Sequence, residues 1–225
     1  MIKAVIFDLD GTLADTICDL RNAMNEMLEH FGFEKRSYDE IRNAICYGQR
    51  EFVARSVPHD KRGDEELITR CQKYYSECYN KCYNDNTLPY PGLREMLRDL
   101  SEKGIRTAVV TNKSHGHALE VCSKCFPDAV FSLVLGYTGE FPTKPDPASA
   151  LYAARVMDAD VCECVFVGDS DVDIKTGINA GMHTVGVSWG YRDEALLRES
   201  GAEAVAHSAD ELYDILTSQV FPAPV

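Results

Sequence analysis

The sequence predicts an α/β fold, with a doubly wound parallel sheet as its core and an inserted α-helical cap domain. Three observations support this prediction. Short apolar runs without strict polar alternation recur along the chain, as is typical of strands buried on both faces of a parallel sheet. Amphipathic helical patterns separate the later runs. One long stretch, residues 16–87, contains helical patterns and no comparable apolar run.

The apolar runs are the expected strands of the sheet. Each is short and ends in polar or small residues, and they lie at residues 4–7, 107–110, 131–134, 164–167 and 184–187. The helices between them are delimited by start and stop residues. We expect a helix over 93–103 that ends at Gly104, one over 147–157 with Asp146 as N-cap and Pro147 as its first residue, and one over 172–180 that ends at Gly181.

The stretch before the second run differs from the rest of the chain. Ser37 and Glu40 form a capping box at the start of one of its helices. Because the strand–helix alternation resumes only after this stretch, we expect a core of residues 1–15 and 88–225 with a cap of residues 16–87. The last residues, 220–225, are expected to be a loose tail. The predicted cap helices are 16–31, 38–47, 49–57 and 64–83.

Composition and charge exclude several classes of protein. The chain has 225 residues, of which 45% are hydrophobic and 26% charged, values typical of a globular protein. The net charge of −13 and the lack of a Lys/Arg-rich block argue against a nucleic-acid partner. No stretch approaches the roughly 20 apolar residues of a membrane span. With nine cysteines and no secretory signal, we expect reduced thiols and a cytoplasmic location. The sequence leaves the oligomeric state open.

Two carboxylates follow the first predicted strand directly. Asp8 and Asp10 precede Gly11, which permits a sharp turn. Functional sites of such sheets lie at the carboxyl ends of the strands. Two acids so close there repel each other unless a cation lies nearby. An aspartate is ionised near pH 7 and needs no base to attack phosphorus. The alternative is a strand end with turn-forming acids.

Candidate anion-binding residues follow at two later points. Thr111 and Asn112 come after the second central strand, and Ser114 can cap the next helix. A hydroxyl, an amide and helix N–H groups suit an anion, although a simple helix cap is an equally good interpretation. Lys144 precedes Pro145, which favours extended backbone just ahead of a helix. This lysine can neutralise both phosphate and carboxylate.

Further carboxylates follow another buried strand. A third and a fourth carboxylate from this segment would complete an oxygen-rich Mg²⁺ site together with the acids of the first strand, and the segment reads Gly168-Asp169-Ser170-Asp171-Val172-Asp173. The alternating acids superficially resemble a calcium-binding loop. That interpretation fails because the sixth position is Ile174 instead of glycine, and the twelfth is Ala180 instead of glutamate.

These four patches, in this order, resemble the haloacid dehalogenase-like hydrolases over almost the whole chain. The run from Thr184 to Tyr191 further looks like the phosphoglycolate phosphatase branch of that family. The resemblance implies a Mg²⁺-dependent phosphatase of a small phosphorylated metabolite, with phosphoglycolate favoured. The matching pieces are Asp8-Leu9-Asp10-Gly11-Thr12, Thr111-Asn112, Lys144-Pro145 and Gly168-Asp169-Ser170-x-x-Asp173.

The resemblance also implies roles for single residues. Asp8 would be the nucleophile that forms an aspartyl-phosphate. Asp10 would protonate the leaving oxygen and then activate water, and its presence favours phosphate esters over carbon–halogen bonds because true dehalogenases lack an acid there. The remaining roles are metal binding by Asp8, the Asp10 backbone carbonyl and Asp169, phosphate binding by Thr111, Asn112 and Lys144, and support of Lys144 or the metal shell by Asp173.

The helical cap and some neighbours of the site leave alternatives open. Gly48 and Arg50 lie between two predicted cap helices, in a segment that resembles the glycine-containing cap loop of this branch. Arg50 could bind a substrate carboxylate or be a solvated arginine at a helix start. Lys113 is either a neighbour of the phosphate or a surface residue, and Trp189 is better explained by packing or loop anchoring than by ligand stacking.

Two other functions remain as alternatives. A phosphosugar mutase can carry the same four motifs and a similar cap, and it would move phosphate instead of releasing it. A non-catalytic binding protein on this fold would be favoured by the loss of Asp8, Asp10 or Lys144, and all three are present.

Overall fold

The computed structural model describes residues 2–217 and 221, and the predicted tail at 220–225 lies outside these residues except for Phe221. The chain divides into two compact units. Residues 1–15 and 89–225 form the first, here called the core unit, and residues 16–88 form the second, the helical unit. Two short strands, β2 (Ala14–Asp15) and β3 (Leu88–Pro89), lie where the chain passes between them.

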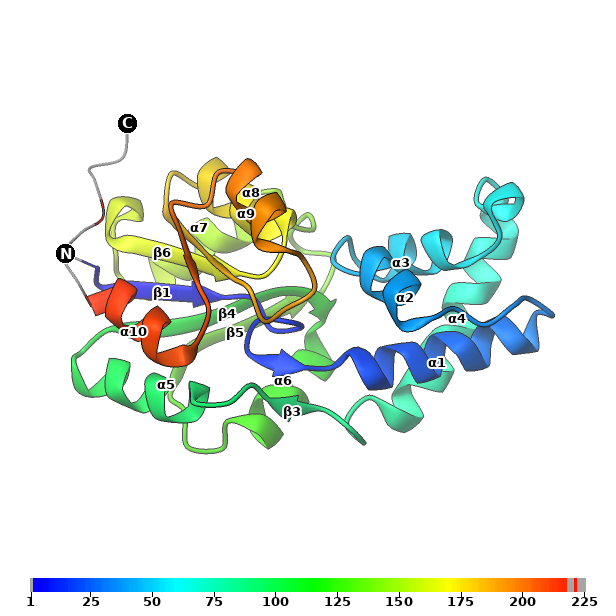
Figure 1. The fold of residues 1–225 in the computed structure, drawn as a ribbon, viewed down its shortest axis with the longest axis horizontal. Coiled ribbons are helices and arrows are strands. Elements are labelled where there is room, and N and C mark those ends of the chain that lie inside the picture. The colour runs from blue at the N-terminus through cyan, green and yellow to red at the C-terminus, as the bar shows by residue number, and fades with distance from the viewer. Residues whose placement is uncertain (1, 218–220, 222–225) are drawn as a thin grey trace. The chain divides into compact units, whose positions relative to one another are not determined.

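A six-stranded parallel sheet lies at the centre of the core unit (Figure 1). The strand order is β5-β4-β1-β6-β7-β8, so the first strand of the chain lies inside the sheet. The five predicted strands are all present, whereas β8 was missed because its three residues carry too short an apolar pattern. The strands are β1 (Ala4–Phe7), β4 (Arg106–Ser114), β5 (Phe131–Tyr137), β6 (Cys164–Gly168), β7 (His183–Val187) and β8 (Ala204–Ala206).

Helices cover both faces of this sheet (Figure 1). On one face, Ile6 and Phe166 pack with Ala150 and Ala153 of α7 in a fully buried cluster. The small side chains of α7 let the helix approach the sheet closely. The predicted doubly wound arrangement is thereby confirmed. The helices are α5 (Leu93–Glu102), α6 (His115–Cys125), α7 (Ala148–Val156), α8 (Asp171–Asn179), α9 (Glu194–Glu199) and α10 (Ala209–Thr217), with a 3₁₀ turn, η2, at Val161–Glu163.

The structure corrects two predicted boundaries. Pro147 is the N-cap of α7 instead of its first residue, and Asp146 accepts a hydrogen bond from the Ala148 amide at 2.9 Å. Thr111 and Asn112 lie within β4 instead of after it, because this strand stays paired with β5 as far as Ser114. The Ser114 hydroxyl does not cap α6 but lies 2.6 Å from His117 Nδ1.

The helical unit consists of amphipathic helices, and α1 and α4 pack against each other. The predicted capping box is confirmed: the Glu40 amide donates to Ser37 Oγ and the Ser37 amide to Glu40 Oε2. None of the helices within residues 2–217 has the length and apolar composition that a membrane span needs. The helices are α1 (Ile17–His30), α2 (Tyr38–Ala44), α3 (Gln49–Ser56) and α4 (Glu65–Cys82), with a 3₁₀ turn, η1, at His59–Lys61.

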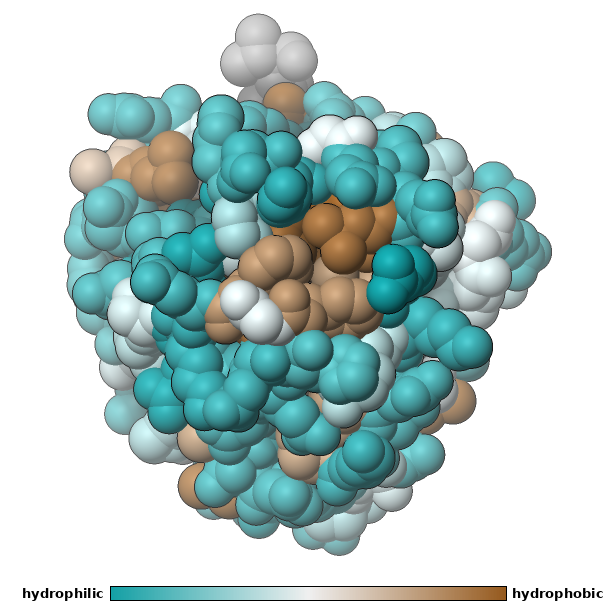
Figure 2. Space-filling view, turned by 90° about the vertical axis from the view of Figure 1, so that its right-hand side faces the viewer, coloured by the Kyte–Doolittle hydropathy of each residue, from teal (hydrophilic) through white to brown (hydrophobic). Residues whose placement is uncertain are grey.

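Aromatic side chains gather where α1 ends. The ring centroids of Phe31 and Phe33 lie 6.5 Å apart, and the Arg70 guanidinium lies 5.6 Å from the Phe31 centroid. Figure 2 shows a face of the molecule that is mostly hydrophilic, with an apolar area near its centre and smaller apolar areas nearer its edges.

A buried carboxylate joins the two ends of the helical unit. Asp19 in α1 is fully buried. It accepts hydrogen bonds from the Asn86 amide, from Asn86 Nδ2 at 2.8 Å and from Thr87 Oγ1 at 2.8 Å. Because residues 86 and 87 follow α4, this one side chain ties the start of the unit to its end.

We predict that Asp19→Ala lowers the free energy of unfolding by about 2–4 kcal/mol, because it removes the charge-assisted hydrogen bonds that the buried carboxylate accepts from Asn86 and Thr87. Urea denaturation measures the change. Asp85→Ala, at an exposed acid in the neighbouring turn, is the matched control and should change stability by no more than about 0.5 kcal/mol. Equal effects of the two changes would contradict a special role for Asp19.

Candidate active site

The carboxyl ends of three adjacent strands bring the predicted site residues together. In the register of the sheet, Phe7 of β1 pairs with Val109 of β4 and with Val167 of β6. Since the strands are parallel, the residues that follow these positions lie at one edge of the sheet. Asp8 therefore lies between the part of β4 that leads to Thr111 and the end of β6, which Asp169 follows.

Asp8, Lys144 and Asp173 form a buried network of charges. Lys144 Nζ lies 2.8 Å from Asp8 Oδ1 and 2.6 Å from Asp173 Oδ1. The lysine is 4% exposed and Asp173 is 1% exposed. Burial lowers the pKa of Lys144, but the charges of Asp173 and Asp8 outweigh this effect and raise the pKa above its usual value. Lys144 is therefore a permanent cation beside Asp8.

Asn112 holds the backbone of Lys144 in place. Its Oδ1 accepts from the Lys144 amide at 2.8 Å, and its Nδ2 donates to the Lys144 carbonyl at 3.2 Å. The next residue of the chain is held as well, since Asn179 Nδ2 donates to the Pro145 carbonyl at 2.9 Å. The predicted phosphate-binding residue Asn112 is thus engaged with Lys144, whose ammonium group it helps to place.

The start of α8 fixes Asp173. The Ser170 amide and hydroxyl both donate to Asp173 Oδ2, at 3.0 and 2.6 Å, where Ser170 is the N-cap of the helix. A Cβ added at Gly168 would lie 2.2 Å from the Asp173 Cβ, so the chain needs glycine there. With Oδ2 held by Ser170 and Oδ1 bound to Lys144, this carboxylate orients the lysine.

Asp169 is completely buried and accepts hydrogen bonds on both oxygens. Thr12 Oγ1 donates to Oδ1 at 2.9 Å, and the Tyr191 amide donates to Oδ2 at 2.7 Å. Gly11 has a φ of +87°, and a Cβ there would lie 2.5 Å from Asp169 Oδ2. The predicted turn glycine is therefore required both by backbone conformation and by space.

The acids of this site suit a divalent cation. Ligand atoms of Asp8, Asp169 and Asp173 lie within 4.8 Å of one another, the one such group among residues 2–217. Burial, more than the neighbouring Asp173, raises the pKa of Asp8 to about 6 against the attraction of Lys144. Burial and then the charges of Asp173 and Asp8 raise the pKa of Asp169 well above its usual value. Excess buried negative charge and an all-oxygen donor set fit Mg²⁺.

The Asp10 side chain turns to a different partner. Lys113 Nζ lies 2.8 Å from Asp10 Oδ1 and 3.2 Å from Oδ2, and the lysine is 9% exposed. From the sequence, Lys113 was either a neighbour of the phosphate or a surface residue. The predicted strand ended before Thr111, whereas in the structure Thr111 and Lys113 are alternate residues of β4, and alternate residues of an extended strand point to the same side.

The helical unit holds the two predicted cap residues. Gly48 precedes α3 and has a φ of +87°, a conformation that favours glycine. Arg50 is exposed and forms an ion pair with Glu65. The structure therefore gives Arg50 a partner within its own unit, and its assignment as a substrate ligand stays a prediction.

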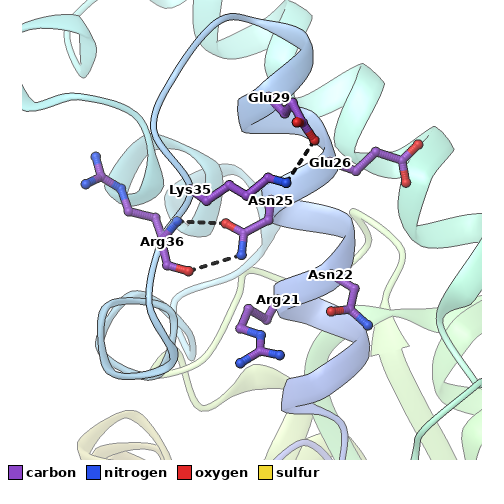
Figure 3. Close-up of a pocket in the computed structure, with 7 residues that line it drawn as sticks. All are labelled: Arg21, Asn22, Asn25, Glu26, Glu29, Lys35 and Arg36. Atoms are coloured by element: carbon purple, nitrogen blue, oxygen red, sulfur yellow. Dashed lines mark hydrogen bonds and ion pairs between the residues drawn. The ribbon is translucent and has the colours of Figure 1, made fainter.

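A polar pocket of about 350 Å³ lies beside α1 in the same unit (Figure 3). Two pairs of its residues bind each other: the Asn25 side chain accepts from the Arg36 amide at 2.7 Å and donates to the Arg36 carbonyl at 3.0 Å, and Lys35 pairs with Glu29 at 3.0 Å. Neither Gly48 nor Arg50 lines it. The strongest candidate site among the described residues is therefore the strand edge of the core unit.

Comparison with known proteins gives concordant matches. Residues 5–187 match the haloacid dehalogenase-like hydrolase family. The chain is 32% identical over 217 residues to the phosphoglycolate phosphatase of Chromobacterium violaceum, with 96% of each chain covered. It is 34% identical over 223 residues to that of Neisseria meningitidis, covering 97% of this chain and 95% of the relative. The crystal structure of CbbY from Rhodobacter sphaeroides in complex with phosphate is 27% identical, with a TM-score of 0.76 and coverage of 94% and 96%.

Proposed function

Because this chain belongs to the haloacid dehalogenase-like hydrolase family and is a phosphoric monoester hydrolase, we propose that it hydrolyses a small phosphorylated metabolite, with phosphoglycolate as the favoured substrate. The observation that carries the proposal is the buried Asp8 held beside Lys144, with Asp169 in the same acidic group and Asp10 paired with Lys113 of β4. The names of the relatives support the choice of phosphoglycolate.

In the proposed reaction, a carboxylate oxygen of Asp8 attacks phosphorus and the ester P–O bond breaks, which leaves an aspartyl-phosphate. Asp10 gives its proton to the departing oxygen and then takes a proton from the water that hydrolyses the intermediate. Lys144 neutralises charge on the transferred group, and the Thr111 hydroxyl donates to it. These steps need positioning and neutralisation of charge, which the buried network supplies.

We propose Mg²⁺ as the cofactor, bound by Asp8, Asp169 and the Asp10 carbonyl, with Asp173 as a supporting residue. When bound, the ion neutralises the acids and draws charge from the phosphoryl oxygens. Asp173 in the structure orients Lys144, which agrees with a supporting role.

Phosphate release from a panel of esters tests the proposal. The panel contains 2-phosphoglycolate, hexose phosphates, nucleotides and pyrophosphate, each with and without Mg²⁺. We expect Mg²⁺-dependent release, fastest from 2-phosphoglycolate. Conversion of a hexose 1-phosphate to its 6-phosphate without phosphate release would instead identify a mutase.

We predict that Lys113→Met lowers kcat about 10²-fold with little change in KM, because the Asp10 carboxylate loses the group that fixes both its oxygens. Steady-state kinetics measure the effect. In an Asp10→Asn background the same substitution should have little further effect, because the two residues act as a unit. Additive losses would show that Lys113 acts independently of Asp10.

A further inference from the structure

The segment Trp189–Tyr191, which follows β7, lies against both loops that carry the metal-binding acids. The Trp189 indole donates from Nε1 to the Thr12 carbonyl at 3.0 Å. The Tyr191 amide donates to Asp169 Oδ2 at 2.7 Å. Just before the segment, the Ser188 amide donates to the Ala206 carbonyl at 3.0 Å, which anchors it to β8.

Gly190 lies so close to the site residues that there is no room for a side chain at this position. An added Cβ would lie 2.3 Å from the Asp169 Cβ and 2.4 Å from the Gly11 carbonyl oxygen. Both neighbours belong to the site itself, and the second is backbone, which cannot yield as a flexible side chain would. The φ of Gly190 lies outside the left-handed region, so space alone requires glycine at this position.

The hydrogen bonds close a circuit through three distant parts of the sequence. Trp189 binds the Thr12 carbonyl, the Thr12 hydroxyl binds Asp169 Oδ1, and Asp169 Oδ2 binds the Tyr191 amide. Two donors, one on each oxygen, fix the plane of the Asp169 carboxylate. Each carboxylate oxygen has a further lone pair, so both remain able to bind a cation.

We propose that Trp189–Tyr191 is a positioning element for Asp169, and that it sets the affinity of the site for a divalent cation. The inference rests on the metal site of the proposed function. Groups that hold a metal-binding side chain through hydrogen bonds typically change metal affinity 10–100-fold when they are altered.

Binding of Mg²⁺ alone, measured by titration calorimetry without substrate, tests the inference. We expect Gly190→Ala to weaken Mg²⁺ binding about 10–100-fold. Trp189→Phe keeps a ring but removes the indole donor, and it should weaken binding several-fold. This second variant keeps the test decisive if the first does not fold.

Gly186→Ala is the matched control. It lies in β7, and its Cβ would press on Leu197 at 3.0–3.4 Å instead of on Asp169. It should lower the melting temperature yet leave the Mg²⁺ affinity unchanged. Wild-type affinity in both Gly190→Ala and Trp189→Phe would overturn the inference, as would an absence of Mg²⁺ binding in the natural chain. A chain that binds Mg²⁺ but releases no phosphate would refute only the phosphatase proposal.

Discussion

Asp8→Asn is expected to reduce the rate of phosphate release by about 10⁴-fold or more, because it removes the proposed nucleophile while preserving the shape of the side chain. The assay is phosphate release from 2-phosphoglycolate with saturating Mg²⁺. Asp85→Asn, at an exposed acid in the helical unit, is the matched control and should retain full activity. Activity of Asp8→Asn within tenfold of the natural chain would exclude Asp8 as the nucleophile.

The same substitution should stabilise the metal-free protein at neutral pH. The pKa of Asp8 is raised to about 6 in the folded state, above the value of about 4 in an unfolded chain. A raised acid pKa means that the folded state loses stability as pH rises from about 4 through about 6. A pKa shift of about two units corresponds to a loss of roughly 3 kcal/mol in the free energy of unfolding. Urea denaturation in the presence of a chelator should therefore show a flatter pH profile for Asp8→Asn.

Lys144→Ala is expected to lower the free energy of unfolding by about 3–5 kcal/mol, because it leaves Asp8 and Asp173 buried without their shared cation. Urea denaturation at pH 7.5 with a chelator measures the loss. The loss should shrink as pH falls towards about 6, because without Lys144, whose charge lowers the pKa of Asp8, the carboxyl takes up a proton at a higher pH than in the natural chain.

Lys175→Ala provides the matched control for that prediction. Lys175 Nζ lies 2.7 Å from Asp171 in α8, but the lysine side chain is 51% exposed. An ion pair in contact with water contributes about 0–1 kcal/mol. If the two lysine variants lost similar stability, burial of the Lys144 network would not be the source of its importance.

The sheet and the positions of the main acids could be predicted because they follow local patterns. Each of the longer buried strands corresponds to an apolar run in the sequence, and the carboxyl ends of parallel strands lie at the same edge of the sheet. The place of a side chain relative to distant residues has no such local signal. Asp19 looks like any acid in the first turn of a helix, and only its bonds to Asn86 and Thr87 reveal its role.

Asn112 and Tyr191 illustrate the same limit inside the site. From sequence, an amide after a strand suggested an anion ligand, whereas the structure engages both ends of that amide with Lys144. Tyr191 donates a hydrogen bond from its backbone amide to Asp169. Almost every residue type has such an amide, so no sequence motif can indicate this contact. Such contacts depend on which loops the fold brings together, 22 to 32 residues apart in the sequence.

The internal position of β1 has a consequence for the order of events on the ribosome. Its sheet partners are β4, which begins at Arg106, and β6, which ends at Gly168. At about 5–20 residues per second, the strand that precedes Asp8 waits roughly 10–30 s for its second neighbour to be translated. The helical unit is one continuous stretch that ends at residue 88, so it can complete its own contacts during that interval. The residue proposed to react first is among the earliest synthesised, and its surroundings are among the latest to assemble.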